Sequence, residues 1–331
     1  MGTVGLVILI AIALVFDFTN GFHDAANAVA VSITTRALRP FAALGLAAGA
    51  NVVGALISTK VAATVGTGII AAPSGTTGLV IVFAGLIGGI AWNLFTWQAG
   101  LPSSSTHALI GGLVGAALAA SSPVLWRGLV DKVVVPMAAS PVIGFLLGYV
   151  LMTGILWSVR KIRPAVVNRD FKHGQVVSTA AMAFSHGTQD AQKTMGVITL
   201  ALVVTSHLAG FAVPLWVILA CAGAMGLGTL AGGWRVIRTV GSRITPLDPP
   251  RAFAAQSAAA TVLLVSAYSY AMPVSSTHVM TSSIMGVGAT RRFTAVRWSV
   301  AQQVVSAWIF TIPGAGLTAY VAYHVVHLFV H

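Results

Sequence analysis

Ten apolar runs separated by short polar segments dominate this sequence. A helix that crosses the hydrocarbon core of a membrane needs roughly 20 apolar residues, so each run predicts one pass. Charged residues make up only 7% of the 331 residues, whereas about a quarter of a soluble chain is charged. The sequence therefore excludes a soluble globular enzyme and predicts an all-α polytopic membrane protein. The runs are 2–35 and 174–206, both interrupted by polar residues, and 40–59, 77–97, 102–120, 133–158, 211–230, 252–271, 272–289 and 298–325.

The basic residues predict the orientation of the chain in the membrane. The net charge is +12, but Lys and Arg fall between the apolar runs and form no continuous patch, which argues against nucleic-acid binding. With both termini placed outside, fourteen basic residues lie on the cytoplasmic side and three on the other. The positive-inside rule favours this arrangement. We therefore expect a multi-pass protein of the inner (plasma) membrane with both termini extracytoplasmic.

The sequence also divides into two related halves. The charge-rich segment 159–173 predicts a cytoplasmic basic linker between residues 1–158 and 174–331, each half holding five runs. The segment FDFTNGFHDAANAV aligns with MAFSHGTQDAQKTM, pairing Asp24 with Asp190, and LPSSSTHALIGGLVG aligns with MPVSSTHVMTSSIMG. Because five is an odd number of passes, the second half must enter the membrane upside down. The sequence predicts two inverted-topology repeats.

Asp24 and Asp190 lie in the middle of the two interrupted runs. A carboxylate near the bilayer centre costs several kcal/mol, and the polar neighbours, with Gly21 and Gly187, predict a break in each helix. Unwound backbone at that depth is tolerated only where it lines a cavity. Each Asp could instead cap a half-helix, or Asp190 could pair with Lys193. Two symmetry-related aspartates in polar clusters favour a functional use.

The repeated P-x-S-S-T-H segments predict two helix N-termini near the bilayer midplane, because Pro and Ser or Thr favour the first turn and the cap of a helix. Ordinary capping is the plainer alternative. A helix start also offers free N–H groups and a partial positive charge, so two converging starts would hold a tetrahedral oxyanion. The hydroxyls expected to contact it are those of Ser104, Ser105, Thr106, Ser275, Ser276 and Thr277.

Carboxylates beside an anion make sense if the anion carries a proton, as hydrogen phosphate does and sulfate at neutral pH does not. The same carboxylates can take up a proton or a co-transported cation, which lowers the cost of moving a multivalent anion against the membrane potential. Coupled symport of inorganic phosphate follows. Lys193 either pairs with Asp190 or attracts phosphate directly. A histidine such as His23 is more often a hydrogen-bonding residue than a proton carrier, although its titration range permits both roles.

At these residues the chain resembles the inorganic phosphate transporter (PiT) family, whose duplicated signature is a G-x-N-D-x-x-N type segment followed by P-x-S-x-T-H. The copies here read GFHDAAN and GTQDAQK. His23 and Gln189 replace the family's Asn before each Asp, and Lys193 stands where the first copy has Asn27. The chain also lacks the long central cytoplasmic loop of animal relatives.

The resemblance implies the bacterial low-affinity permease branch, which couples to protons and carries neutral metal–phosphate complexes, and it leaves a sodium-coupled symporter as the alternative. It adds Asn27 and Lys193 to the residues expected to bind phosphate. Coupling is expected at Asp24, Asp190, His23 and Gln189. No cofactor and no certain protein-bound metal are predicted, and a homodimer is left open.

Three other functions compete with this interpretation. A sulfate permease of the same superfamily differs in the anion that competes for uptake. An intramembrane hydrolase using Ser and His would not need both motifs twice, and the sequence contains no G-x-S-x-G elbow. A passive anion channel would have no need of buried acids. We therefore expect a transporter, not an enzyme.

Overall fold

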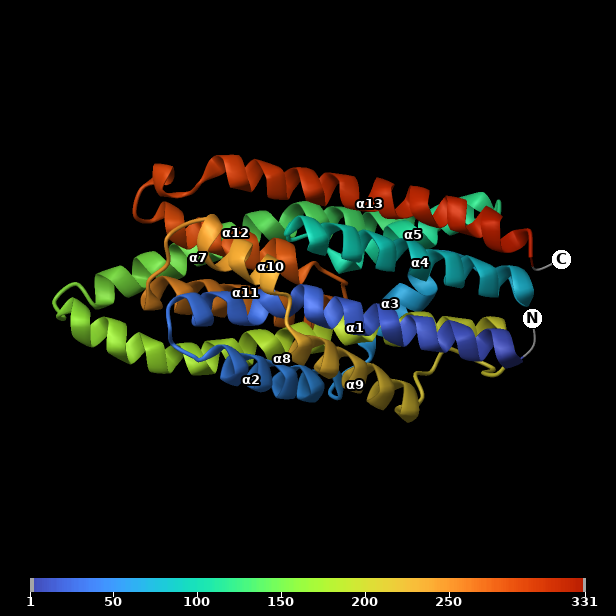
Figure 1. Ribbon diagram of the computed structural model, residues 1–331, viewed down its shortest axis with the longest axis horizontal. Helices are drawn as coiled ribbons and strands as arrows, with labels where there is room; N and C mark the ends of the chain where they lie inside the picture. The colour runs from blue at the N-terminus through green and yellow to red at the C-terminus, as the bar shows by residue number, and fades with distance from the viewer. Residues whose placement is uncertain (1–2, 330–331) are drawn as a thin grey trace.

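The computed structural model describes residues 3–329, which form an elongated bundle of helices (Figure 1). The described residues also contain two short π-helical segments, η1 (Val130–Val134) and η2 (Thr239–Arg243), and one 3-10 segment, η3 (Phe293–Ala295). The α-helices are α1 (Thr3–Thr34), α2 (Pro40–Ala55), α3 (Lys60–Gly68), α4 (Thr76–Ala99), α5 (Ser105–Ala119), α6 (Trp126–Leu129), α7 (Val135–Ser158), α8 (Pro164–Val204), α9 (Leu215–Ala231), α10 (Trp234–Arg238), α11 (Pro249–Tyr270), α12 (Ser276–Ala289) and α13 (Trp298–His327).

Each of the ten apolar runs coincides with a helix, and the short helices α3 and α10 were not expected from the sequence. Five helical segments are long and apolar enough to cross a membrane, and up to seven if two bent pairs each count as one span. The bent pairs are α2 with α3, at 72°, and α9 with α10 and η2, at 60°. The chain is thus a multi-pass membrane protein by length and composition.

The predicted interruption of the first and sixth runs is wrong, because α1 and α8 are continuous helices of 32 and 41 residues. The glycines serve packing instead. A Cβ on Gly21 would stand 2.5 Å from the carbonyl oxygen of Met225, and one on Gly187 would overlap the carbonyl of Asn51. Glycine lets these backbones approach closely, as in other membrane helix pairs. Polar side chains near the expected breaks, Asp24 and Asp190 among them, find partners on neighbouring helices, so the backbone need not unwind.

The helix contacts occur in matched pairs. Helix α1 packs against α9 as α8 packs against α2, and α5 packs against α13 as α12 packs against α7, so each of these contacts joins a helix before residue 159 to one after it. The chain segments before and after residue 159 are therefore interleaved, and α8 itself begins inside the basic segment 159–173. The start of α1 and the end of α13 lie at one end of the bundle, and the turn between α7 and α8 lies at the other (Figure 1).

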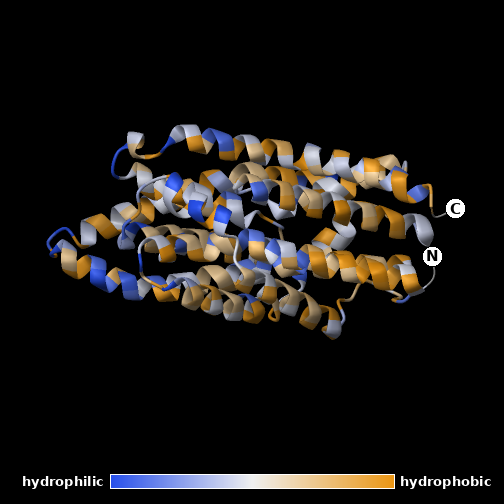
Figure 2. Cartoon of the chain, viewed as in Figure 1, coloured by the Kyte–Doolittle hydropathy of each residue, from blue (hydrophilic) through white to orange (hydrophobic). Residues whose placement is uncertain are grey.

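Polarity follows the same layout. Hydrophilic residues gather at the end where α7 meets α8 and again in the middle of the bundle, while the outer helix surfaces elsewhere are mostly hydrophobic (Figure 2). Membrane lipid cannot hydrogen-bond polar groups, so a polar band inside the bundle must be satisfied by the protein or by what it binds. The helix starts of α5 and α12 lie in this band.

Candidate functional site

The site is built around the N-termini of α5 and α12. Before each of them the preceding helix ends at a left-handed residue, Gly100 or Ala271, and an extended segment follows. Ser104 and Ser275 then cap the helices, each accepting a hydrogen bond at 3.2 Å from the backbone N–H three residues later. The rings of the histidines that follow lie 4.8 Å apart, centroid to centroid. The two helix starts therefore lie side by side.

Asp24 of α1 faces both helix starts. Its Oδ2 accepts a hydrogen bond from Ser105 Oγ at 2.8 Å, and its Oδ1 accepts one from Thr277 Oγ1 at 3.2 Å. His23 Nδ1 lies 2.8 Å from the same Oδ1, and His23 Nε2 lies 3.3 Å from Thr96 Oγ1. One carboxylate thus joins α1 to both repeated motifs.

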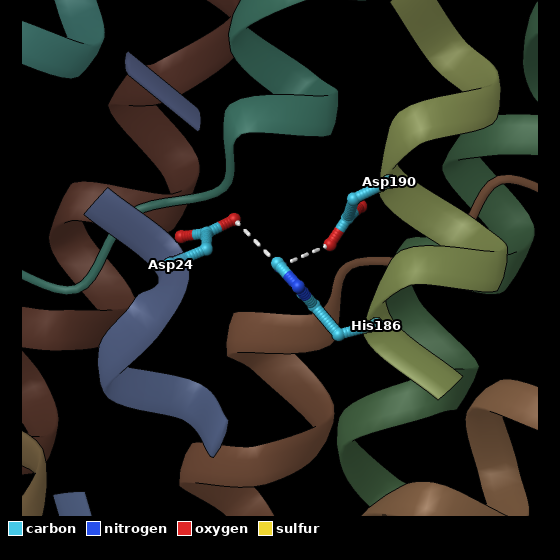
Figure 3. A group of neighbouring side chains, drawn as sticks. All are labelled: Asp24, His186 and Asp190. Carbon is cyan, nitrogen blue, oxygen red and sulfur yellow. Dashed lines mark ion pairs between the residues drawn. The ribbon is translucent and has the colours of Figure 1, made fainter. Parts of the chain in front are cut away.

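Asp190 of α8 has the matching position. Its Oδ2 accepts a hydrogen bond from Ser276 Oγ at 2.8 Å, and its Oδ1 is paired with the Lys193 ammonium. His186 Nε2 lies 2.7 Å from Asp190 Oδ2 and 3.9 Å from Asp24 Oδ2, so this ring stands between the two carboxylates (Figure 3). His186 is not among the site residues expected from the sequence. Its position one helical turn before Asp190, on the same face, was the available signal.

Asn27 and Lys193, which are paired in the alignment, each reach the motif of the other half. Asn27 Nδ2 donates to Thr277 Oγ1 at 2.9 Å, and the Lys193 ammonium donates to Thr106 Oγ1. The equivalent residues of the two halves thus make equivalent contacts. The structure brings together nearly all of the residues that the motifs single out.

Gln189 and the two capping serines have other contacts. Gln189 Nε2 donates to the backbone oxygens of Leu263 and Met272, at 3.2 Å each, and so holds the extended segment before α12. Within residues 3–329 its side chain makes no hydrogen bond to either aspartate. The hydroxyls of Ser104 and Ser275 accept bonds from their own helix starts, so the capping alternative describes what these two side chains do here.

The site is buried and rich in hydrogen-bond donors. The side chains of the two aspartates, Lys193 and the four central hydroxyl residues are at most 2% exposed. Because the caps take the N–H groups of His107 and His278, the first two N–H groups of each helix remain as donors toward an anion. One ligand atom each from Asp24, His186 and Asp190 also lies within 4.8 Å of the others, a spacing that could hold a metal ion.

The site consists of two helix starts and two carboxylates, which duplicated motifs supply inside an apolar bundle. This arrangement is typical of the binding site of a membrane transporter. The sequence model of the phosphate transporter family matches residues 20–169 and 159–319, and the chain belongs to this family. A protein of Mycobacterium tuberculosis (strain ATCC 25618 / H37Rv) named "Probable low-affinity inorganic phosphate transporter" is 47% identical over 326 residues, which cover 97% of this chain and 78% of that protein. A protein of Bacillus subtilis (strain 168) with the same name is 42% identical over 327 residues, covering 98% of each.

A solved structure titled "The sodium-dependent phosphate transporter" has the same fold, with a TM-score of 0.90. The match covers 99% of this chain and 100% of that one, at 23% sequence identity. At this identity the likeness concerns the fold alone. The relatives of the chain are named as transporters, which agrees with the expectation that it is not an enzyme.

Proposed function

We propose that this protein imports inorganic phosphate across the inner membrane as a secondary active transporter, by symport with protons. The observation that carries the proposal is the equivalent use of both motifs: Ser105 bonds Asp24 and Ser276 bonds Asp190, while Asn27 and Lys193 reach across to Thr277 and Thr106. A symmetric set of donors suits one tetrahedral anion at the junction of the halves. Family membership and the names of the relatives support phosphate as that anion.

Phosphate binding in this scheme uses the backbone N–H groups and hydroxyls of Ser105, Thr106, Ser276 and Thr277, with Lys193 as the cationic partner. The N–H groups and the ammonium can donate to the anion directly. In the structure, hydroxyl groups donate hydrogen bonds to Asp24 and Asp190. When phosphate binds, these hydroxyls donate to the anion instead, and the carboxylates accept either the P–OH of phosphate or a coupling proton. Sulfate at neutral pH brings no such proton, which is the physical basis for discrimination.

The membrane arrangement belongs to the same proposal. Ten passes in two inverted repeats, 1–158 and 174–331, with both termini outside, agree with the basic-residue count and with the matched helix contacts of the two halves. Helices α5 and α12, of 15 and 14 residues, are about 21–23 Å long, shorter than the roughly 30 Å hydrocarbon core. They are suited to start near the midplane, where the site would be reached alternately from each side.

Three potential metal ligands in the site bear on whether phosphate is carried free or as a metal complex. Asp24, His186 and Asp190 offer two carboxylates and an imidazole at a spacing that fits one divalent ion, and such an ion could enter as a neutral metal–phosphate complex. Free phosphate with protons on the carboxylates is the simpler form. A sodium-coupled mechanism is the alternative, favoured by the fold likeness to a transporter whose title says sodium-dependent.

Uptake of radiolabelled phosphate into proteoliposomes tests the function. We expect accumulation when an inward proton gradient is imposed, competition by arsenate, and weak competition by sulfate, because arsenate shares the protonation of phosphate. Asp24→Asn should abolish accumulation, since it removes the acceptor for the P–OH. Accumulation only with a sodium gradient would favour the alternative coupling ion. Sulfate competing as well as arsenate would favour a sulfate permease.

A further inference from the structure

A second polar cluster lies on α1 before the phosphate site. Asp17 precedes Asp24 by seven residues and Asn20 stands between them, so the three side chains share one face of the helix. At 1.5 Å per residue, Asp17 is about 10 Å from Asp24 along the axis. Asp17 and Asn20 are both 0% exposed. None of the contacts that hold Asp24 involves Asp17.

Asn93 of α4 completes the cluster. The Phe16 ring lies 3.0 Å from the position a Cβ on Gly89 would take, and His23 Nε2 lies 3.3 Å from Thr96 Oγ1. The two residues of each pair are 73 positions apart in the sequence. Because this separation is the same for both pairs, α1 and α4 run parallel in this register. The same offset places Asn93 opposite the asparagine of the cluster. Its side chain is also 0% exposed.

Most of the polar side-chain atoms of the cluster lack protein partners. Asp17 Oδ1 accepts a hydrogen bond from Thr194 Oγ1 at 3.0 Å. Within residues 3–329, Asp17 Oδ2 and both amide atoms of Asn20 and of Asn93 have no hydrogen-bond partner. Burying such groups unpaired costs free energy. Three fully buried side chains, placed at the same level of α1 and α4 by the helix register and without direct bonds to one another, are suited to share a ligand.

Two of the three cluster positions are polar in only one copy of the duplicated sequence, and the third, Asn20, aligns with His186. The motif alignment pairs Asp17 with Ala183. The left-handed residues that end α4 and α11 align these helices and pair Asn93 with Leu264. The phosphate contacts recur in both halves, whereas these two polar positions are apolar in the second half. The cluster therefore serves something other than the symmetric anion site.

We propose that Asp17, Asn20 and Asn93 bind a coupling cation, a single H⁺ or Na⁺, at a site separate from phosphate and from any proton carried on Asp24 or Asp190; this rests on the proposed function. Carboxylate and amide oxygens are ligands for hard cations. One carboxylate balances one positive charge, and a divalent ion would leave an uncompensated charge in a low-dielectric interior. The titratable groups near Asp17 are His186 and Lys193 on α8 and Cys221 on α9.

A short path on α8 links the two sites. Thr194 donates to Asp17, and its neighbour Lys193 pairs with Asp190 and Thr106. A cation on Asp17 removes a negative charge close to where the anion binds, so cation and phosphate each favour the binding of the other. Such linkage is reciprocal. It gives the site a role in coupling without contact with phosphate.

Two measurements on the same proteoliposomes test the proposal. Gradient-driven phosphate accumulation is recorded with a pH gradient in the absence of Na⁺ and, separately, with a Na⁺ gradient at equal pH; phosphate–phosphate exchange is recorded without any gradient. The variants are Asp17→Asn and Asn93→Leu, the latter taking the residue found in the second half. Thr199→Val is the matched control, because Thr199 is buried on α8 and bonds only the Met195 oxygen of its own helix.

We expect both variants to lose accumulation by about tenfold or more, a change within the usual range of coupling energies. Asp17→Asn should still exchange phosphate within about threefold of the unmodified protein, because its neutral side chain mimics the carboxylate with a cation bound. The control should keep both activities. The gradient to which the unmodified protein responds identifies the ion.

Accumulation by Asp17→Asn at the unmodified level would overturn the proposal. Loss of exchange in folded Asp17→Asn protein would also overturn it, because that result would place Asp17 in the phosphate step. Unmodified protein that exchanges phosphate but responds to neither gradient would also overturn it while leaving phosphate transport intact. If the unmodified protein neither exchanges nor accumulates phosphate, the proposed function itself fails.

Discussion

At the scale of single residues, the two central aspartates accept hydrogen bonds from equivalent serines, but only one of them is paired with a lysine. Ser105 donates to Asp24 and Ser276 to Asp190, each at 2.8 Å. Lys193 pairs with Asp190, whereas the residue aligned with it in the first half is the neutral Asn27. Asp24 therefore has no ammonium partner. We expect it to accept the P–OH of phosphate, whereas Asp190 stays paired with Lys193.

Substitution of the matched serines tests the symmetric anion site. Ser105→Ala and Ser276→Ala should each weaken the apparent phosphate affinity by about five- to a hundredfold, because a hydrogen bond to a charged acceptor contributes on the order of 1–3 kcal/mol. The losses should be similar, since the two serines make equivalent contacts. Phosphate titration of uptake in proteoliposomes measures both.

The control for this pair is Ser32→Ala. Ser32 is also fully buried, on α1, but its hydroxyl bonds only the Val29 oxygen in the same helix. Its removal should leave the phosphate affinity unchanged. A large loss for Ser105→Ala with none for Ser276→Ala would show that the anion is held by one half of the protein.

At the scale of elements, glycine determines how closely the long helices approach. Gly54 of α2 and Gly187 of α8 face each other's helices, and a Cβ on either would overlap a backbone carbonyl, that of Phe184 or Asn51. The contact between α2 and α8 therefore has no room for a methyl group. This approach brings Asn51 within reach of His186, at 3.1 Å from its Nδ1, and so orients the ring between the aspartates.

Gly187→Ala should lower the stability of the folded protein by about 1–3 kcal/mol, the usual cost of overpacking, and should also impair transport because the helix that carries Asp190 must shift. Gly223→Ala is the matched helical control, since nothing lies within 4 Å of its added Cβ. That change should be neutral or stabilising by up to about 1 kcal/mol through helix propensity. Thermal unfolding in detergent compares the two. Equal midpoints for both variants would contradict the packing role of Gly187.

At the scale of the whole molecule, the direction of the chain in the membrane sets which side each end of the bundle faces. The start of α1 and the end of α13 share one end, and the α7–α8 turn lies at the other (Figure 1). That turn joins the most basic segment, 159–173, to the bundle. From the positive-inside rule we therefore expect this end to face the cytoplasm.

Cysteine labelling of intact cells tests this orientation on a Cys221→Ser background, since Cys221 is the one cysteine of the sequence. Ala165→Cys, at an exposed position of the basic segment, should resist an impermeant thiol reagent until the cells are opened. His207→Cys, at an exposed position between α8 and α9, should react from outside. The reverse pattern would invert the topology and would make the protein an exception to the charge rule.

Much of this molecule follows from local sequence. The apolar runs predict where the helices lie, because burial in lipid requires a helix of sufficient length. The P-x-S-S-T-H segments predict the starts of α5 and α12, because Pro and the capping serine act within a few residues of the chain. The duplicated motifs predict that Asp24 and Asp190 belong to one site, since repeated chemistry in a duplicated chain indicates equivalent positions.

Other features were decided only by tertiary packing. The continuity of α1 and α8 depends on polar partners and glycine contacts from distant helices, and a local reading of Gly21 and Gly187 wrongly predicts a break. His186 joins the two aspartates, and Gln189 turns away to the segment before α12. The sequence separations involved reach 73 residues and more, and loop lengths do not fix which faces of two helices meet. Helix position is thus a local property of this chain, whereas the partner of each buried polar side chain is set by how the helices pack.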